Sequence, residues 1–407
     1  MKIGLLTYHA ACNFGANLQA LSTVSYWKEH GYEPVFINWM TKDLQEYYLK
    51  NTPKEQNEAH KAFRNQYFPM TRECHTDEEV AAVINEEGIE AIVVGSDAVM
   101  KTNPIWSRYK FPTRKVVSVY HPTSDSICPN PFWGSYYPLL GRDIPLCYMS
   151  ASSQNSPYKS SNKEERQLAK ELLSRYTYIS TRDDWTSKMV EWLTGGSKRP
   201  PVTPDPVFAF NYNVKEQPTE GDIRKRFGLE DNYCLFSFHS TRAVNMEWLQ
   251  QMKEKMYERG VTCVAFPFPQ GVNFNHPFDK EITLPLSPMD WYALIKYAYA
   301  YIGENMHPIV VALHNAVPCF SFDNYGIIKY HFIVNEKSSK IYHILNKFGQ
   351  NENRIALFGR YAMPTPQYVL EKLDGYNKNQ VRRVAEEHIE AYRKMMTDIE
   401  NAIKYYK

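Results

Sequence analysis

The first forty residues of the chain constrain its fold most, because they form a strand, a loop, a helix and a second strand in close succession. Residues 2–8 are a short apolar run of the kind found in buried parallel strands. Apolar residues recur at helical spacing over 18–27, Gly31 ends that helix, and residues 35–37 predict the second strand. The loop leads into the N-terminus of this helix, where unpaired backbone N–H groups favour binding of an anion or a polar ligand. Because the loop lacks the G-x-G-x-x-G spacing, it is not a dinucleotide fingerprint.

Strands alternate with helices along both halves of the chain. In the first half we expect strands at 90–94, 146–149 and 177–180 and helices at 77–87, 163–173 and 185–193; in the second, strands at 234–238, 261–266, 299–303 and 317–322 and helices at 246–258, from Ser287, at 309–315 and at 379–405. Glycine and proline gather in 195–218, which marks a linker. The pattern predicts an α/β protein with two Rossmann-like domains facing a cleft. We expect domains at 1–195 and 219–375, a linker at 196–218 and a C-terminal helix within 376–407.

Residues 101–145 break the alternation. They hold seven prolines among many aromatic side chains. A long irregular loop inside a compact domain is usually functional or mobile. We therefore expect this insertion to belong to the binding surface for an acceptor substrate.

Composition excludes several classes of protein. The net charge of +2 gives no basis for bulk binding to nucleic acid or to an anionic membrane surface. The seven cysteines are scattered without a C-x-x-C pair, which argues against a disulfide framework and against a zinc site, and no other metal-ligand spacing is visible. The sequence shows neither a secretory leader after Met1 nor a run of eighteen apolar residues. We expect a cytoplasmic protein without a metal.

The strongest site candidate is His307, because it follows the predicted strand 299–303 directly. Ligands of open parallel sheets bind at the carboxyl ends of strands. Pro308 suits a first helical position, which would leave the N–H groups of Ile309 and Val310 facing an anion. A histidine beside such an anion can be held cationic and then give up its proton.

Other strand ends supply further candidates whose roles stay open at this point. Arg182 suits a bidentate clamp on phosphate or carboxylate, or a surface salt bridge with Asp183 or Asp184. Lys340 supplies a second positive charge or is simply solvated. Asp97 binds acceptor hydroxyls or caps a turn.

Seven segments of the chain resemble, in order, motifs of the polysaccharide pyruvyl transferase family. They are Tyr8-His9-Ala10 with Asn13-Phe14-Gly15-Ala16, Val93-Val94-Gly95-Ser96-Asp97, Tyr148-Met149-Ser150-Ala151-Ser152, Ile179-Ser180-Thr181-Arg182-Asp183, Thr203-Pro204-Asp205-Pro206, Asn305-Met306-His307 and Ser338-Ser339-Lys340. The resemblance implies a glycosyltransferase-B-like fold. It also implies transfer of a pyruvyl group from phosphoenolpyruvate to two hydroxyls of one sugar, with formation of a cyclic ketal and release of phosphate.

The resemblance also implies roles for the candidates. His307 would be the catalytic acid; Arg182, Lys340, Asn305, Ile309 and Val310 would bind the donor; His9, Asn13, Gly15 and Asp97 would bind the acceptor. Phosphoenolpyruvate would serve as donor substrate, with no cofactor. The acceptor would be a sugar of a bacterial surface or exopolysaccharide precursor, either a lipid-linked oligosaccharide, met peripherally at the inner face of the membrane, or a nucleotide sugar.

The chain departs from the family pattern at a few positions, and these keep two alternatives open. Asn305 stands where many members have Arg or Ser, and Pro308 replaces the usual Gly. A nucleotide-sugar glycosyltransferase would share the fold, with Glu304 or Asp323 as a carboxylate for the ribose. The other alternative is a non-catalytic member of a polysaccharide-assembly complex.

Overall fold

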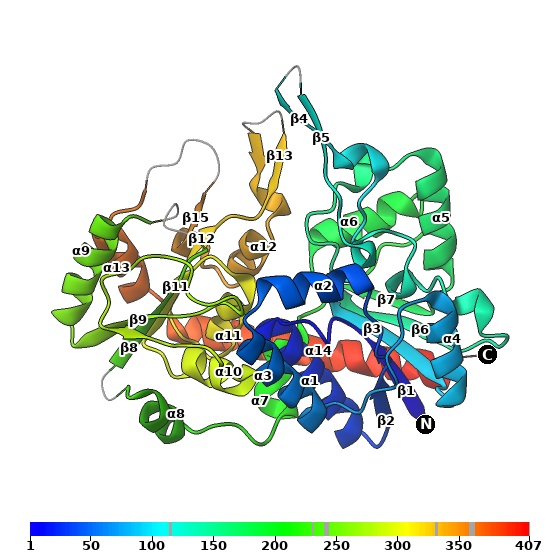
Figure 1. The fold of residues 1–407 in the computed structure, drawn as a ribbon, viewed down its shortest axis with the longest axis horizontal. Helices are drawn as coiled ribbons and strands as arrows, with labels where there is room; N and C mark the ends of the chain where they lie inside the picture. The colour runs from blue at the N-terminus through cyan, green and yellow to red at the C-terminus, as the bar shows by residue number, and fades with distance from the viewer. Residues whose placement is uncertain (114–115, 230–231, 240–243, 330–332, 358–362, 407) are drawn as a thin grey trace.

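The computed structural model describes residues 1–113, 116–229, 232–239, 244–329, 333–357 and 363–406. Two parallel β-sheets dominate it, one in each half of the chain, and helices cover both (Figure 1). The α/β class and the two Rossmann-like sheets predicted from the sequence are confirmed.

The first sheet has the order β2-β1-β3-β6-β7. Its strands are β1 (Lys2–Leu6), β2 (Glu33–Phe36), β3 (Ala91–Asp97), β6 (Leu146–Ala151) and β7 (Tyr178–Thr181). Its helices are α1 (Phe14–Glu29), α2 (Lys42–Asn51), α3 (Lys54–Tyr67), α4 (Asp77–Glu86), α5 (Lys163–Ser174) and α6 (Asp184–Leu193). Because the strand order reverses between β1 and β3, their carboxyl ends form the crevice where such sheets bind ligands.

The second sheet has the order β10-β9-β8-β11-β12-β15. Its strands are β8 (Asn232–Ser237), β9 (Val261–Ala265), β10 (Lys280–Glu281), β11 (Ala300–Gly303), β12 (Cys319–Asp323) and β15 (Arg354–Ala356). Its helices are α8 (Glu220–Phe227), α9 (Met246–Tyr257), α10 (Pro288–Lys296), α11 (Met306–His314), α12 (Lys340–Lys347) and α13 (Pro366–Asp374). The order reverses between β8 and β11, so the loops after these two strands are the expected ligand-binding loops of this domain.

The last helix, α14 (Lys378–Lys404), ties the two domains together. It starts beside the second sheet and runs behind the molecule to β6 and β7 of the first (Figure 1). The Tyr26 hydroxyl of α1 donates to the Glu400 carboxylate over 2.8 Å. In the linker, the 3₁₀ helix η6 (Pro206–Ala209) and α7 (Phe210–Asn213) pack on α1, and one cluster of buried apolar side chains joins both domains. The two halves are therefore packed against each other.

The proline-rich segment 101–145 is more ordered than an irregular loop. It contains a hairpin of β4 (Tyr109–Thr113) and β5 (Val116–Val119) and the 3₁₀ helices η1 (Ile105–Arg108), η2 (Ser124–Ser126), η3 (Pro131–Trp133) and η4 (Tyr137–Leu139). Trp133 and Tyr136 are fully buried and anchor it to the domain. The hairpin projects from the same side of the molecule as the hairpin of β13 (Ile327–Lys329) and β14 (Ile333–Asn335) (Figure 1). Across the described ranges, no helix is long and apolar enough to cross a membrane.

Candidate active site

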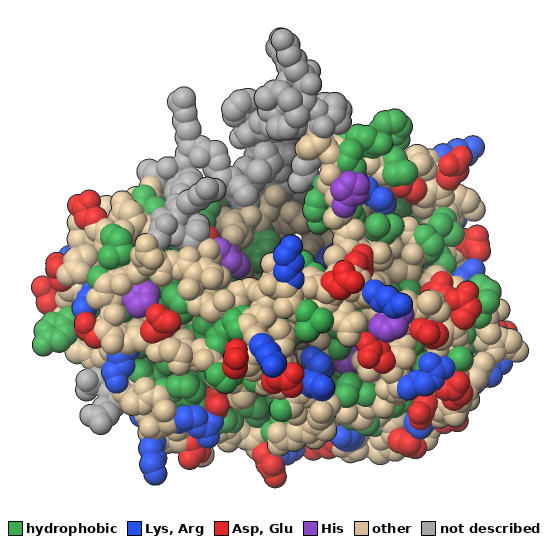
Figure 2. Space-filling view, viewed as in Figure 1, with side chains coloured by type: hydrophobic (Ala, Val, Ile, Leu, Met, Phe, Trp, Pro, Cys, Tyr) green, Lys and Arg blue, Asp and Glu red, His purple; other side chains and the backbone are tan. Residues whose placement is uncertain are grey.

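A cavity of about 170 Å³ lies between the two domains, at the carboxyl ends of both sheets. The surface is hollowed at this place (Figure 2). The first domain contributes Asn13, Phe14, Gly15, Asp97 and Gln154, and the second contributes Ser237, Pro267, Phe268, Pro269, Trp291, Asn305, Met306, His307, Pro308, Tyr325 and Lys340. Six of the predicted site residues line this cavity, although they are far apart in the sequence: Asn13, Gly15, Asp97, Asn305, His307 and Lys340.

Helix α11 brings His307 into the cavity, although its start differs from the prediction. The helix begins at Met306 with Asn305 as its N-cap, so Pro308 takes the third position and not the first. The unpaired N–H groups of such a helix belong to its first turn, which here means Asn305, Met306 and His307. Ile309 and Val310 are fully buried in the next turn and do not line the cavity. Their predicted contact with the donor is therefore wrong.

Contact between α1 and α11 fixes the position of the His307 ring. A Cβ atom added to Gly15 would lie 2.1 Å from Cγ of His307, so only glycine fits at this position of α1. Nε2 of His307 is buried and has no hydrogen-bond partner among the described residues. Burial lowers the pKa of His307 to about 4, which the carboxylates of Asp205 and Asp97 only partly oppose. The imidazole is thus neutral at pH 7 before any ligand binds.

Lys340 is the cation that faces the cavity from the second domain. It is the first residue of α12, where the Ser339 hydroxyl caps the helix and donates to Asp323 over 2.6 Å. Its ammonium lies 4.2 Å from the centre of the Tyr325 ring. Burial lowers the pKa of Lys340 to about 8, with a further lowering by Arg182. Lys340 therefore still carries its charge at neutral pH.

Asn305 presents an amide group whose orientation is fixed by two neighbours. Its Oδ1 accepts a hydrogen bond from the Tyr325 hydroxyl over 3.2 Å and lies 3.1 Å from Nε2 of His239. The His239 ring stacks on Phe268 at a centroid distance of 4.1 Å. With the oxygen engaged in this way, the two N–H groups of the amide remain for a ligand.

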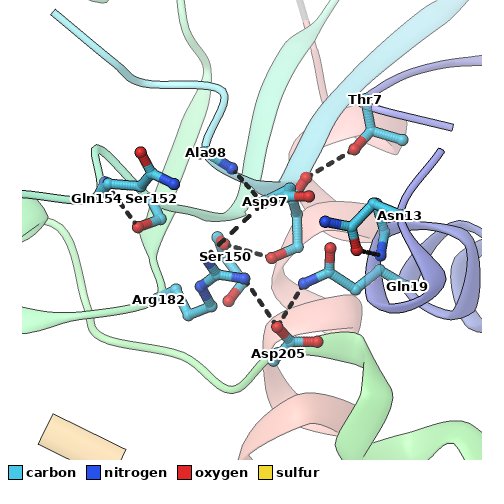
Figure 3. Close-up of polar contacts among 12 residues, drawn as sticks. Thr7, Asn13, Gln19, Asp97, Ala98, Ser150, Ser152, Gln154, Arg182 and Asp205 are labelled. Carbon is cyan, nitrogen blue, oxygen red and sulfur yellow. Dashed lines mark hydrogen bonds and ion pairs between the residues drawn. The ribbon is translucent and has the colours of Figure 1, made fainter. Parts of the chain in front are cut away.

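Arg182 is held in a buried ion-pair cluster beside the cavity (Figure 3). Its Nη1 donates to Oδ2 of Asp205 over 2.9 Å, and its Nη2 lies 3.9 Å from Oδ1 of Asp97. Gln19 also donates to Asp205. The Arg182 side chain is only 4% exposed and does not line the cavity. Its predicted role as a clamp on the donor is therefore not supported by this placement.

The predicted salt-bridge partners of Arg182 were also wrong. Asp183 instead caps α6, accepting from the backbone N–H of Thr186 over 2.7 Å. Asp184 pairs with Lys188 on the surface. The true partner, Asp205, comes from the linker.

Asp97 ends β3 and lines the cavity opposite Lys340. Burial would raise the pKa of Asp97, but Arg182, His307, Lys340 and Lys101 outweigh it, so the net shift is downward and the group is a carboxylate. Its φ of 92° lies in a region that side chains other than glycine rarely adopt. Gln154, which also lines the cavity, has a φ of 54°. Such strained residues cluster at functional sites.

Comparison with known proteins agrees with these features. The family model for polysaccharide pyruvyl transferase matches residues 13–325, which include Asp97, Arg182, Asn305 and His307. The chain belongs to this family. Among curated proteins, none matches the sequence significantly.

Solved structures match the fold over the whole chain. A structure of a UDP-N-acetylglucosamine 2-epimerase from Listeria monocytogenes, described as putative, is 10% identical with a TM-score of 0.51, covering 100% of this chain and 97% of that one. The S. aureus MnaA–UDP structure is 12% identical, with a TM-score of 0.51 and coverages of 100% and 96%. Anabaena HepE in complex with UDP is 9% identical, also with a TM-score of 0.51 and coverages of 98% and 100%. At these identities the likeness shows only the glycosyltransferase-B-like fold, as the sequence predicted.

His9 was predicted on the acceptor side, but the structure places it in the core of the first domain. It is fully buried, and its ring stacks on Phe36 at a centroid distance of 4.9 Å. Its Nδ1 lies 3.1 Å from the Thr7 carbonyl and its Nε2 lies 3.2 Å from Oδ1 of Asn38. Because both nitrogens are engaged and the residue does not line the cavity, His9 is not a ligand-binding residue of this site.

Several cavity residues were missed by the sequence analysis. Gln154 follows β6, Ser237 ends β8, and Pro267, Phe268 and Pro269 follow β9. The rule that ligands bind at strand carboxyl ends would have found all of them, had it been applied to every predicted strand. Trp291 lies inside helix α10 and carried no such signal. In the described part of the chain, no group of three or more His, Cys, Asp or Glu side chains could hold a metal ion.

Proposed function

We propose that the protein transfers a pyruvyl group from phosphoenolpyruvate to two hydroxyls of one sugar, releasing phosphate. The observation that carries the proposal is that His307 and Lys340 line one cavity between the two domains. Among the residues that the structure describes, Nε2 of His307 has no hydrogen-bond partner and Lys340 has no ion-pair partner. Together they supply a proton donor next to an anion site. Membership of the family supports the same reaction.

The donor is expected to bind against the second domain. Phosphoenolpyruvate carries a carboxylate and a phosphate, and the Lys340 ammonium, the Asn305 amide and the free N–H groups of the first turn of α11 are suitable partners. The Asn305 amide would take the place of the arginine or serine of other members, as an uncharged group that donates hydrogen bonds to phosphoenolpyruvate. The cavity volume of about 170 Å³ suits a small molecule of this size.

Binding of this anion would change the protonation of His307. Negative charge next to the ring raises the pKa of His307 from its ligand-free value of about 4, so that the ring takes up a proton. His307 then gives this proton to the methylene carbon of the donor. The neighbouring carbon becomes electrophilic and forms a bond to the first sugar hydroxyl oxygen.

The remaining steps close the ketal. Asp97 accepts the hydrogen bond of the incoming hydroxyl and passes its proton to the departing phosphate, which leaves with the electron pair of its bond to carbon. The second hydroxyl of the same sugar then bonds to that carbon and releases its proton, which restores His307. The acceptor would lie on the first domain, where Asn13, Gln154 and Asp97 line the cavity.

The carboxylates proposed for a nucleotide-sugar enzyme are not available in the structure. The Glu304 side chain accepts from the backbone N–H of His239, and Glu304 is 4% exposed. Asp323 is fully buried and is bound by Ser339 and Arg354. Neither can reach a ribose without breaking these contacts.

Two measurements on the purified protein test the proposal. Phosphoenolpyruvate should raise the melting temperature, while UDP- and GDP-sugars should not. Phosphate release from phosphoenolpyruvate should require a glycan acceptor, and mass spectrometry should show the ketal on the product. Stabilisation by a nucleotide sugar with no effect of phosphoenolpyruvate would favour the glycosyltransferase alternative. Stabilisation by phosphoenolpyruvate without turnover on any precursor of the polysaccharide would favour a non-catalytic member.

We further propose that the acceptor is a precursor of a surface polysaccharide or exopolysaccharide on the cytoplasmic side. A lipid-linked acceptor would bring the protein to the inner face of the membrane as a peripheral protein, and a nucleotide-sugar acceptor would not. Sedimentation of the protein with membranes that carry the lipid-linked precursor, but not with membranes that lack it, distinguishes the two.

A further inference from the structure

A second and larger cavity, of about 360 Å³, lies within the first domain. It is lined by Ala10, Cys12, Asn38, Met40, Gln45, Tyr48, Leu49, Asn57, Glu58, Lys61, Arg64, Asn65, Met70 and Glu73. These residues come from the loops after β1 and β2, from α2 and α3, and from the segment that follows α3. The cavity thus lies at the carboxyl ends of two parallel strands, where sheets of this type bind ligands.

One loop separates this cavity from the main one. Cys12 lines the second cavity and the next residue, Asn13, lines the first. A ligand with a reacting group at Asp97 could therefore extend into the second cavity.

The lining has the chemistry of a binding site for a neutral polyhydroxyl ligand. Amide side chains are frequent, and the two carboxylates of Glu58 and Glu73 balance the two cations of Lys61 and Arg64. A phosphate or a sialic-acid-like carboxylate would meet both acids, whereas hydroxyl groups can donate to the acids and accept from the cations and amides. Tyr48 and the thioethers of Met40 and Met70 add apolar surface for the faces of a sugar ring.

Part of this lining is fixed in place by the protein. Nη1 of Arg64 donates to the Ala10 carbonyl over 3.0 Å, and Asn57 donates to the Thr52 carbonyl over 2.9 Å. Gln45 donates to Glu73 over 3.1 Å. In contrast, the exposed side chains of Lys61 and Asn65 have no hydrogen-bond or ion-pair partner among the described residues. A preformed wall with unused polar groups is what a ligand site requires.

We infer that this cavity binds a neutral sugar ring of the acceptor, adjacent in the glycan to the ring that receives the pyruvyl group. The inference rests on the proposed function for the identity of the reaction. It adds that the enzyme recognises an oligosaccharide and not an isolated sugar.

The test uses the full-length protein and two neighbouring tryptophan variants of α3. Asn65→Trp fills the cavity, and Gln66→Trp places the same side chain on an exposed residue of the same helix that does not line it. The probes are methyl glycosides of glucose, galactose, mannose and N-acetylglucosamine, and disaccharides that carry one more neutral hexose on each. Binding is measured by saturation-transfer NMR without phosphoenolpyruvate, and turnover by phosphate release with it.

We expect the wild type and Gln66→Trp to bind at least one disaccharide about tenfold more tightly than its monosaccharide, as one or two additional hydrogen bonds allow. Asn65→Trp should lose this preference but keep its stabilisation by phosphoenolpyruvate. Lys61→Ala should reduce the preference without filling the cavity, which guards against misfolding of the tryptophan variant. If Asn65→Trp preferred the disaccharide over the monosaccharide as strongly as the wild type does, the inference would be overturned. Tighter binding of glucose 1-phosphate than of the neutral sugars, reversed by inorganic phosphate, would also overturn it.

The two proposals fail in different ways. Disaccharide binding that depends on Asn65, without phosphate release on any acceptor, would contradict the proposed reaction and leave the sugar site standing. Phosphate release with no advantage of a disaccharide would leave the reaction standing and remove the sugar site.

Discussion

Two cations near the cavity between the domains, the buried Arg182 and the half-buried Lys340, differ in how the protein uses their charge. Arg182, from the first domain, has Asp205 at 2.9 Å and Asp97 at 3.9 Å. Lys340, from the second domain, has no carboxylate within ion-pair distance among the described residues and faces the cavity. A cation that is already paired inside the protein holds the structure together, whereas an unpaired one is free to bind an anion. This difference supports a structural role for Arg182 and the proposed role of Lys340 in binding the donor.

The largest effect on the reaction rate is expected from a change of His307, whose Nε2 has no partner among the described residues. His307→Gln should lower the rate of phosphate release roughly 10²–10⁴-fold, the usual cost of losing a general acid. Stabilisation by phosphoenolpyruvate should persist, because Lys340 and Asn305 remain. The matched control is His314→Leu, which changes a half-buried histidine of the same helix outside the cavity and should keep its activity. A His307→Gln enzyme with more than about a tenth of the wild-type rate would exclude His307 as the acid.

Arg182→Met tests the other half of the comparison. Removing one partner of a buried pair leaves Asp205 and Asp97 uncompensated, which typically costs about 3–5 kcal/mol in the free energy of unfolding. Urea denaturation measures this loss, and Asp205→Asn in the same chain should recover part of it. In the folded fraction, the KM for phosphoenolpyruvate should change little. A strongly raised KM at unchanged stability would return Arg182 to the role of a donor clamp.

Gly15→Ala tests whether the packing of the two domains sets the position of His307. The new Cβ would lie 2.1 Å from Cγ of His307, so α1 and α11 would have to separate. A displacement of about 1 Å at a reacting group can cost about 10²-fold in rate. We expect a loss of that order in kcat with a smaller change in thermal stability. Ala16→Gly, one residue along the same helix, is the control and should retain most of the rate.

The sequence predicted the sheets well because their signal is local. Apolar runs and helical spacing identify an element without knowledge of its neighbours, and most boundaries of the predicted elements lie within two residues of the observed ones. The short strands β10 and β15 and the helices α2, α3, α8, α12 and α13 were not predicted. The start of α11 was an exception: Pro308 is tolerated as readily at its third position as at the first, so proline alone does not fix the start of a helix.

The roles of Arg182 and His9 could not be predicted, because they depend on contacts between distant residues. Asp205 lies 23 residues after Arg182, and no sequence pattern links the two. His9 and Asn13 share one loop, yet the first packs on Phe36 and the second faces the cavity. A loop has no periodicity from which the direction of each side chain could be read.

Removing the unpaired cation should weaken donor binding. Lys340→Met should raise the KM for phosphoenolpyruvate roughly 10–100-fold, since hydrogen bonds to charged groups contribute about 1.5–3 kcal/mol. The change in kcat should be smaller, because Lys340 binds the donor and does not transfer the proton. Lys347→Met, on the same helix but outside the main cavity, is the matched control and should leave KM unchanged. If KM rose equally in Lys340→Met and Lys347→Met, the cause would be the loss of positive charge near the cavity and not the loss of a contact between Lys340 and the donor.

The smallest expected effect is the pH dependence of the same contact. Burial and the neighbouring Arg182 and Lys101 lower the pKa of Lys340 to about 8, against the raising effect of Asp97 and Asp323. A lowered pKa means that the ammonium loses its proton as the pH rises through about 8, while it is still cationic in the unfolded chain. The free enzyme should therefore lose kcat/KM for phosphoenolpyruvate progressively above pH 8, by up to the factor measured for Lys340→Met. Lys340→Arg should remove this decline, because arginine stays protonated in this range. A decline that persists in Lys340→Arg would show that another group titrates, and the loss of activity above pH 8 would then not report on Lys340.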